Sequence, residues 1–207
     1  MKALSEYRTR TLIILGDETG RRYSTNILDT AIETALGTLK NYLPHKETVR
    51  MKVSGISGRE AVLNWSPETG AEILTIRNES GDLLNASDYR TGGRTYLQFY
   101  GCGPIPAAGD LLQVELGLPH VIRDLDGARM TTVPDSLMLT VCTGAAGYAM
   151  RMRARSVTEV FGKRPEDTEN LIAQADTLET AYLAALNELS LSESLHRDPW
   201  PHLGFPI

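Results

Sequence analysis

The sequence predicts an α+β protein: a helical bundle built from both chain ends, an inserted antiparallel β sub-domain and an extended C-terminal arm. Apolar residues recur at steps of three and four near both ends, as in helices, whereas the middle alternates apolar and polar residues, as in strands. The end of the chain keeps neither period and is rich in proline. The expected ranges are 1–44 and 133–189 for the bundle, 45–132 for the β sub-domain and 190–207 for the arm.

Two helices are expected before residue 44. The first has Ser5 as its N-cap and ends near residue 15. The acidic segment 16–21 that follows is interpreted as a turn, because it lacks the spacing of a phosphate-binding loop. The second helix has Ser24 as its N-cap and ends at Pro44. Its apolar stripe consists of Leu28, Ile32, Leu36, Leu39 and Leu43.

Strands are expected in the middle of the chain. Val49, Met51 and Val53 alternate with polar residues, which is typical of a strand with one buried face. Short connections rich in glycine, proline and aspartate leave no room for crossover helices, so they predict an antiparallel meander. A polar loop is expected over residues 120–132. The further strands are expected at about 60–65, 71–77, 94–100 and 111–117.

Two helices are also expected in the last part of the chain. The first begins near Pro134 and Asp135, which suit a first helical turn. The second begins near Pro165 and needs a helical partner along its apolar stripe, which consists of Leu171, Ala175, Leu178, Tyr182, Ala185 and Leu189. Small residues in the first of these helices predict close packing against another helix: Gly144, Ala145, Ala146, Gly147 and Ala149.

Composition argues against several classes of function. With 21 Lys and Arg against 26 Asp and Glu, the net charge is −5, which argues against a protein whose main task is to grip nucleic-acid phosphates. No apolar segment of the length of a secretion leader or a membrane span is expected. The two cysteines, Cys102 and Cys142, are expected to be reduced thiols.

No sequence motif indicates catalysis or a cofactor. The four histidines lack the spacing of a zinc site and are expected on the surface, and no serine stands in a nucleophile elbow. Cys102, between two glycines, is interpreted as a turn residue rather than a nucleophile. We therefore expect a protein that is not an enzyme, with no catalytic residue, no cofactor and no metal.

A basic cluster stands near the end of the third expected helix. Arg151, Arg153 and Arg155 occur at every second position. On a helix, Arg151 and Arg155 share one side, whereas Arg153 points elsewhere. The cluster is interpreted either as favourable charge near a helix C-terminus or as a contact with an acidic partner surface or with DNA.

The expected arm carries two apolar anchors, Trp200 and Phe205. Prolines stiffen this segment, so it loses less conformational entropy when it docks than a flexible segment would. Two interpretations stay open for the arm. It either packs back onto its own domain or docks onto another subunit or a partner.

Several short segments, taken in order, match a known pattern. They are Leu12–Asp17, Arg22–Ser24, Leu28–Leu36, Leu43-Pro44, Ile76–Leu84, Ser87–Tyr89 and Val133–Leu137. Their order along most of the chain resembles that of the head-to-tail connector proteins of tailed bacteriophages, the adaptor or head-completion family. The β sub-domain is larger here than in the compact, all-helical members of that family.

The resemblance implies a structural virion protein, made in the host cytoplasm and located in the neck at the head–tail interface. It implies a homo-oligomeric ring, commonly twelvefold, that binds the portal protein and a neck, stopper or tail protein, with no membrane partner. Such a ring extends the channel through which DNA passes transiently, and a net negative charge would let DNA slide without being held. The resemblance also implies a portal-docking role for the arm residues Trp200, His202 and Phe205.

Three alternatives stay open. The first is another neck or tail-completion protein, although such proteins are usually more β-dominated. The second is an unrecognised hydrolase, because two catalytic carboxylates can lie far apart in a sequence. The third is a carbohydrate-binding β module, which would use aromatic residues of the middle segment: Trp65, Tyr89, Tyr96, Phe99 and Tyr100.

Overall fold

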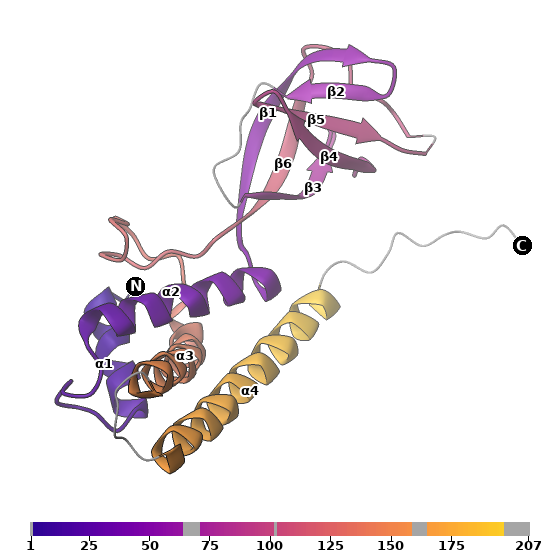
Figure 1. Ribbon diagram of the computed structural model, residues 1–207. Coiled ribbons are helices and arrows are strands. Elements are labelled where there is room, and N and C mark those ends of the chain that lie inside the picture. Colours follow the sequence, from indigo (N-terminus) through magenta and orange to yellow (C-terminus); the bar gives the residue numbers. More distant parts are fainter. Residues whose placement is uncertain (1, 64–70, 102, 159–164, 197–207) are drawn as a thin grey trace, which may run out of the picture. The chain divides into compact units, whose positions relative to one another are not determined.

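The computed structural model describes residues 2–63, 71–101, 103–158 and 165–196 (Figure 1). Within these ranges the chain forms four α-helices and a six-stranded antiparallel sheet, which confirms the α+β prediction. It divides into a helical unit, drawn from Met1–Leu43 and His120–Ile207, and a β unit, Pro44–Pro119. The helices are α1 (Leu4–Ile14), α2 (Thr25–Tyr42), α3 (Met138–Thr158), which follows a short 3₁₀ turn at Asp135–Leu137, and α4 (Pro165–His196).

The N-caps of the first two helices differ in how well they were predicted. Ser24 caps α2, since its hydroxyl accepts a hydrogen bond from the Ile27 N–H at 3.4 Å, as expected. The N-cap predicted for α1 is wrong, because Ala3 rather than Ser5 holds that position. The Ala3 N–H donates to the Glu6 carboxylate at 3.3 Å, and Leu4 N–H donates to the carbonyl of Arg123, so distant backbone fixes the start of α1.

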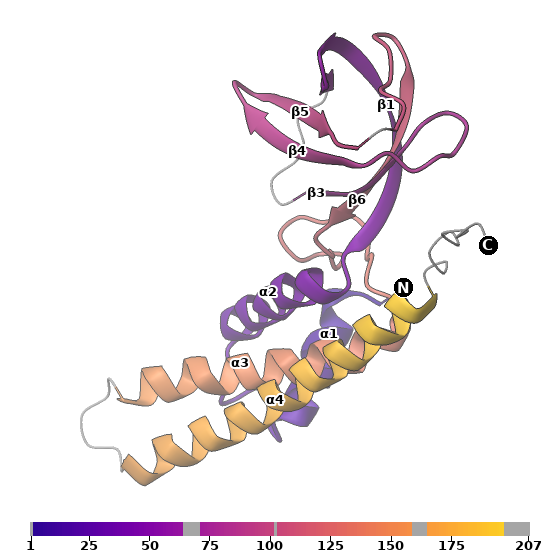
Figure 2. The ribbon, with the colours of Figure 1, turned by 90° about the vertical axis from the view of Figure 1, so that its right-hand side faces the viewer.

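Helix α3 lies in the centre of the helical unit, with α4 packed along it and α1 and α2 packed on its other sides (Figure 2). The small residues predicted to allow close packing do so. A Cβ added at Gly144 would lie 2.6 Å from the Tyr182 ring, and one at Gly147 would lie 2.8 Å from Glu179 Cγ. The Tyr182 hydroxyl passes from α4 to α2 and donates to the buried Ala35 carbonyl at 2.6 Å.

The loop of residues 120–132 is part of the helical unit, whereas the sequence places it in the β sub-domain. Ile122 and Leu125 are buried in the helical core, which fixes the loop there. His120 is also buried, so its expected surface position is wrong. Its imidazole Nε2 lies 2.9 Å from the Leu43 carbonyl oxygen, and its Nδ1 lies 3.3 Å from the Thr132 hydroxyl. The contact with Leu43 joins the two places where the chain leaves and re-enters the helical unit.

The β unit is one sheet with the strand order β3-β6-β1-β2-β5-β4. The prediction of a meander is therefore wrong, because β6 pairs with β1 and β3 instead of with β5. The connection between β5 and β6 is long enough to carry the chain back across the sheet. The strands are β1 (His45–Ser57), β2 (Glu60–Leu63), β3 (Glu72–Arg77), β4 (Ala86–Thr91), β5 (Arg94–Phe99) and β6 (Leu111–Leu118).

The sheet curls, as Figure 1 shows. Strand β1 is long enough to pair with two strands, β6 along its first part and β2 along its second part. Its register with β2 shifts between Val53 and Gly55. The Arg90 guanidinium, on edge strand β4, donates to the carbonyl of Ala71, beside edge strand β3, at 2.7 Å. The two edges therefore approach each other. The core inside the curl consists of Met51, Val53, Ala61, Leu63, Ile76, Leu84, Leu97, Phe99, Leu112, Val114 and Leu116.

One strand and one helix end differ from the sequence predictions. Strand β4 was not expected, because this edge strand is polar and mostly exposed and so lacks the apolar alternation of a half-buried strand. The arm was expected to begin at residue 190, but α4 continues to His196. Residues 190–194 read Ser-Leu-Ser-Glu-Ser and lack the apolar period, yet they contain no proline and extend an existing helix.

Candidate functional site

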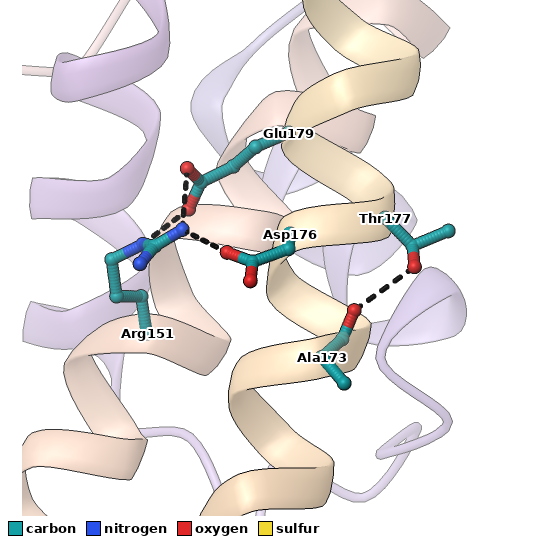
Figure 3. Close-up of polar contacts among 5 residues, drawn as sticks. All are labelled: Arg151, Ala173, Asp176, Thr177 and Glu179. Carbon is teal, nitrogen blue, oxygen red and sulfur yellow. Dashed lines mark hydrogen bonds and ion pairs between the residues drawn. The ribbon is translucent and has the colours of Figure 1, made fainter.

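Arg151, the first residue of the basic cluster, joins α3 to α4 (Figure 3). Its guanidinium donates to the two carboxylate oxygens of Glu179 at 2.7 and 2.9 Å and to Asp176 at 2.5 Å. These hydrogen bonds, the one to Glu179 first, raise the pKa of Arg151 above its ordinary value. The charge of Arg151 is therefore balanced inside the chain.

The other two arginines of the cluster have different surroundings. Arg153 donates to the carbonyl of Arg22 at 3.0 Å, and its guanidinium carbon lies 5.1 Å from the centre of the buried Tyr23 ring. This is a cation–π contact that holds α3 to the turn before α2. Arg155 is exposed in the last turn of α3, where a positive charge is favourable. The structure thus does not gather the three arginines on one surface, and a contact with an acidic partner or DNA stays a prediction.

The arm residues Trp200, His202 and Phe205 lie outside the described residues. The described part of the chain ends with α4 at His196. The portal-docking role of these three residues therefore stays a prediction.

Aromatic residues gather on the outer face of the curled sheet. The Tyr89 and Tyr96 rings stack with their centroids 5.1 Å apart. The Tyr89 hydroxyl donates to the Glu60 carboxylate at 2.9 Å, and this hydrogen bond raises the pKa of Tyr89. Tyr100 extends the same face and shares a hydrogen bond of 2.6 Å with Ser87.

The other aromatic residues that were expected to form a carbohydrate-binding surface, Phe99 and Trp65, are not part of this described face. Phe99 is buried in the sheet core, since successive residues of a strand point to opposite sides. Trp65 lies outside the described residues. The aromatic face therefore consists of Tyr89, Tyr96 and Tyr100, surrounded by polar side chains.

A second stripe on α4, which the sequence analysis missed, faces away from α3. Its members recur at steps of four and three, none is charged, and all are exposed. Figure 3 shows two of them, Ala173 and Thr177, on the side of α4 opposite Arg151. The Thr177 hydroxyl donates to the Ala173 carbonyl at 2.9 Å, which leaves its methyl group to face outward. We call this stripe the α4 outer face: Ala173, Thr177, Thr180, Ala184, Asn187 and Leu191.

A shallow groove lies on α1, where it meets the start of α3. Its volume is about 330 Å³, and Ile13, at its wall, is 48% exposed. Glu6 in the groove is paired with Lys2 at 2.9 Å, whereas Arg10 has no ion-pair partner within the described residues. We call this feature the α1 groove; its lining residues are Ser5, Glu6, Thr9, Arg10, Ile13 and Met138.

A smaller cavity of about 240 Å³ lies in the β unit, between the connection that follows β3 and the connection that precedes β6. Its walls combine polar groups, such as Asn78 and Asp110, with apolar ones. Two of the apolar residues, Ile105 and Leu111, are each 38% exposed. The cavity is therefore an open, mixed surface rather than an enclosed pocket.

Two further structural findings concern only the described residues. Within them, no three His, Cys, Asp or Glu side chains come together as metal ligands. None of their helices combines the length and the hydropathy that crossing a bilayer requires.

Cys142, buried in α3, points its thiol at the carbonyl of Tyr7 with an Sγ–O distance of 3.7 Å. Burial raises the pKa of this thiol to about 11, so it stays protonated at neutral pH. Its environment is that of a packed core cysteine.

Comparison of the sequence with models of known protein families and with curated proteins gives no match.

Proposed function

We propose that this chain is a subunit of the ring that joins the head of a tailed bacteriophage to its neck or tail and extends the DNA channel below the portal. The observation that carries the proposal is the division of the chain. Helices from both chain ends pack into one unit, and the segment between them forms a separate β unit. That order of elements is also the basis of the resemblance to the connector proteins.

In this proposal the four helices act as a bundle that forms the wall of the ring. The close packing of α3 against α4 at Gly144 and Gly147 supports a rigid wall. The net charge of −5 and the pairing of Arg151 with its own chain's carboxylates support a surface that does not hold DNA phosphates. The β unit would meet a neighbouring subunit or the next neck component.

We further propose that residues 197–207 are the portal-docking arm. They follow directly on α4, the longest helix of the described chain, which would set the starting point of the arm. Trp200 and Phe205 would fill apolar pockets on the portal, and His202 would lie between them.

Reconstitution with the portal protein of the same phage tests both proposals. We expect the full-length chain to form a ring complex with purified portal, visible by electron microscopy, and a chain truncated after His196 to bind more weakly. Trp200→Ala should weaken binding without shifting the thermal transition. Met130→Ala, which removes a 60% exposed apolar side chain from the loop before α3, is the matched control and should bind normally. Unchanged binding by the truncated chain contradicts the docking arm, and absence of any complex contradicts the connector function.

A carbohydrate-binding module is the second candidate, and the stacked Tyr89–Tyr96 pair with the neighbouring Glu60 carboxylate favours it. Sugar rings stack on exposed aromatic faces, and their hydroxyls bind carboxylates. If this candidate is correct, the chain should bind components of a glycan array and Tyr89→Ala should abolish that binding. Absence of glycan binding by the unmodified chain contradicts it.

A further inference from the structure

Three of the exposed large apolar side chains of the helical unit lie at or beside the α1 groove and the α4 outer face. Among the described residues, the large apolar side chains that are more than a third exposed in this unit are Ile13, Met130, Leu139, Ile172, Leu183 and Leu191. Ile13 belongs to the α1 groove, and Leu139 is next to the groove residue Met138. Leu191, 65% exposed, belongs to the α4 outer face. The two places lie on different helices, and each helix packs on α3.

The α4 outer face has the spacing of a helix-packing surface. Two residue triplets, 173, 180, 187 and 177, 184, 191, each repeat every seven positions. This is the spacing that brings a stripe repeatedly against a partner helix. The small residues Ala173 and Ala184 would allow that partner to approach closely. Because α3 already occupies the opposite side of α4, the outer face is available to another molecule.

Charge distinguishes the two surfaces. Helix α4 contains no lysine or arginine, and the single positive charge of Arg151 offsets only one of the two negative charges of Asp176 and Glu179. Glu188, exposed beside Ala184 and Leu191, adds a negative charge next to the α4 outer face. In the α1 groove the charge without an ion-pair partner is positive. Glu6 is paired with Lys2, whereas Arg10 has no ion-pair partner within the described residues. A contact between two α4 outer faces would bring like charges together, whereas a contact between the α4 outer face and the α1 groove joins opposite charges.

We propose that the α4 outer face of one copy of this chain docks into the α1 groove of a second copy. The proposal rests on the ring function proposed above and names the surfaces through which the subunits join. An interface between two different patches is heterologous, and repetition of it generates a ring when the rotation closes. The face from Ala173 to Leu191 is about 27 Å long at 1.5 Å per residue. A single such contact is smaller than a standard protein interface, so pairwise association is expected to be weak.

Two charge-introducing variants test the interface, each at an exposed position. Ala184→Glu blocks the α4 outer face, and Ile13→Glu blocks the α1 groove. Gln174→Glu places the same charge on an exposed position of α4 outside the outer face and is the control. All variants should keep the thermal transition of the unmodified chain, measured by circular dichroism. Association of the full-length proteins is then measured by sedimentation equilibrium up to about 1 mM, where an interface with a Kd of about 0.5 mM is half-occupied.

We expect the unmodified chain and Gln174→Glu to associate beyond the dimer, and each blocked variant alone to associate at least about tenfold more weakly, the change that corresponds to one lost apolar contact. Mixing the two blocked variants should give a 1:1 dimer and nothing larger, because one intact face and one intact groove remain. A mixture that stays monomeric, or association unchanged in either blocked variant, overturns the interface. An unmodified chain that is monomeric at the highest concentration also overturns it, whereas failure of the ring function itself would appear in the portal reconstitution.

Discussion

At the scale of single residues, Gly144 determines how closely α3 and α4 approach. A Cβ at this position would lie 2.6–2.8 Å from three atoms of the Tyr182 ring, which is itself fixed by its hydrogen bond to Ala35. We expect Gly144→Ala to lower the free energy of unfolding by about 1–3 kcal/mol, as overpacking does. Gly37→Ala, in α2 with open space around the added Cβ, is the control and should raise it by about 0.5–1 kcal/mol. Urea denaturation measures both, and a Gly144→Ala chain as stable as the unmodified one contradicts the packing argument.

Asp17, in the turn between α1 and α2, makes stability depend on pH. Its burial raises the carboxyl pKa, but hydrogen bonds from the backbone N–H groups of Arg22, Tyr23 and Arg21 outweigh this effect and lower it below the ordinary value. A lowered pKa in the folded state stabilises the fold above the ordinary carboxyl pKa of about 3.9, and that stability is lost as pH falls through the folded-state pKa. We therefore expect Asp17→Asn to destabilise the protein at pH 7, and the difference in stability from the unmodified chain to shrink as the pH falls through the folded-state pKa of Asp17. Thermal unfolding of both chains between pH 7 and about pH 2 measures this difference in stability. An Asp17→Asn chain as stable as the unmodified chain at pH 7 contradicts the prediction.

Several residue-level features could be predicted and others could not. Ser24 as an N-cap follows from local chemistry, because a cap is made by residues three apart. The burial of His120 could not be predicted, because it depends on Leu43, which is 77 residues away. The pairing of Arg151 likewise depends on residues 25 and 28 positions along the chain. Sequence spacing alone could therefore show a basic cluster but not which carboxylates neutralise it.

At the scale of elements, the Arg151–Glu179 pair joins α3 to α4. The Arg151 side chain is 35% exposed and that of Glu179 is 18% exposed, so solvent screens part of their attraction. A double-mutant cycle with Arg151→Met and Glu179→Gln should give a coupling energy of about 0.5–1 kcal/mol, since the geometry is bidentate. The coupling should fall at 1 M salt, where the screening length is about 3 Å. A coupling of zero at low salt would show that the pair does not stabilise the helix packing.

The elements that were predicted correctly are those with a strong apolar period. The apolar stripe of α2, and that of α4 that faces α3, could both be recognised in the sequence. The same holds for the alternating apolar and polar residues of β1 and β6. Strand β4 was missed because its pairing partner β5, not its own composition, makes it a strand. The α4 outer face was missed for a related reason. Its alanines, threonines and asparagine are small or polar, so the more apolar stripe on the opposite side of α4 dominated the interpretation.

At the scale of the whole molecule, the helical unit should fold without the β unit. The imidazole of His120 lies 2.9 Å from the Leu43 carbonyl, so the two ends of the helical segments meet where the β unit is inserted. We expect a chain in which residues 44–119 are replaced by a short glycine-rich linker to keep its helical circular dichroism and a cooperative thermal transition. Loss of cooperative unfolding in that chain would show that the helical unit needs the β unit to fold.

The place in the sequence where the β unit begins could be predicted, but the order of the strands in the sheet could not. The change from helical to strand period near residue 44 marks the start of the insertion, and the β unit begins at Pro44. The end of the insertion at Pro119 could not be predicted. Ile122 and Leu125 are buried in the helical core, but they belong to a loop whose apolar residues show no helical or strand repeat. The non-sequential strand order was hidden as well, since it depends on which strand pairs with β6.

The proposed function, joining head to tail, is tested most directly by deleting the gene for this chain from the proposed phage. Electron microscopy of the resulting lysate should show DNA-filled or leaking heads that lack tails, together with free tails. Supplying the full-length chain in trans should restore tailed particles, and supplying the chain truncated after His196 should not. Tailed, infectious particles formed without the gene would contradict the account.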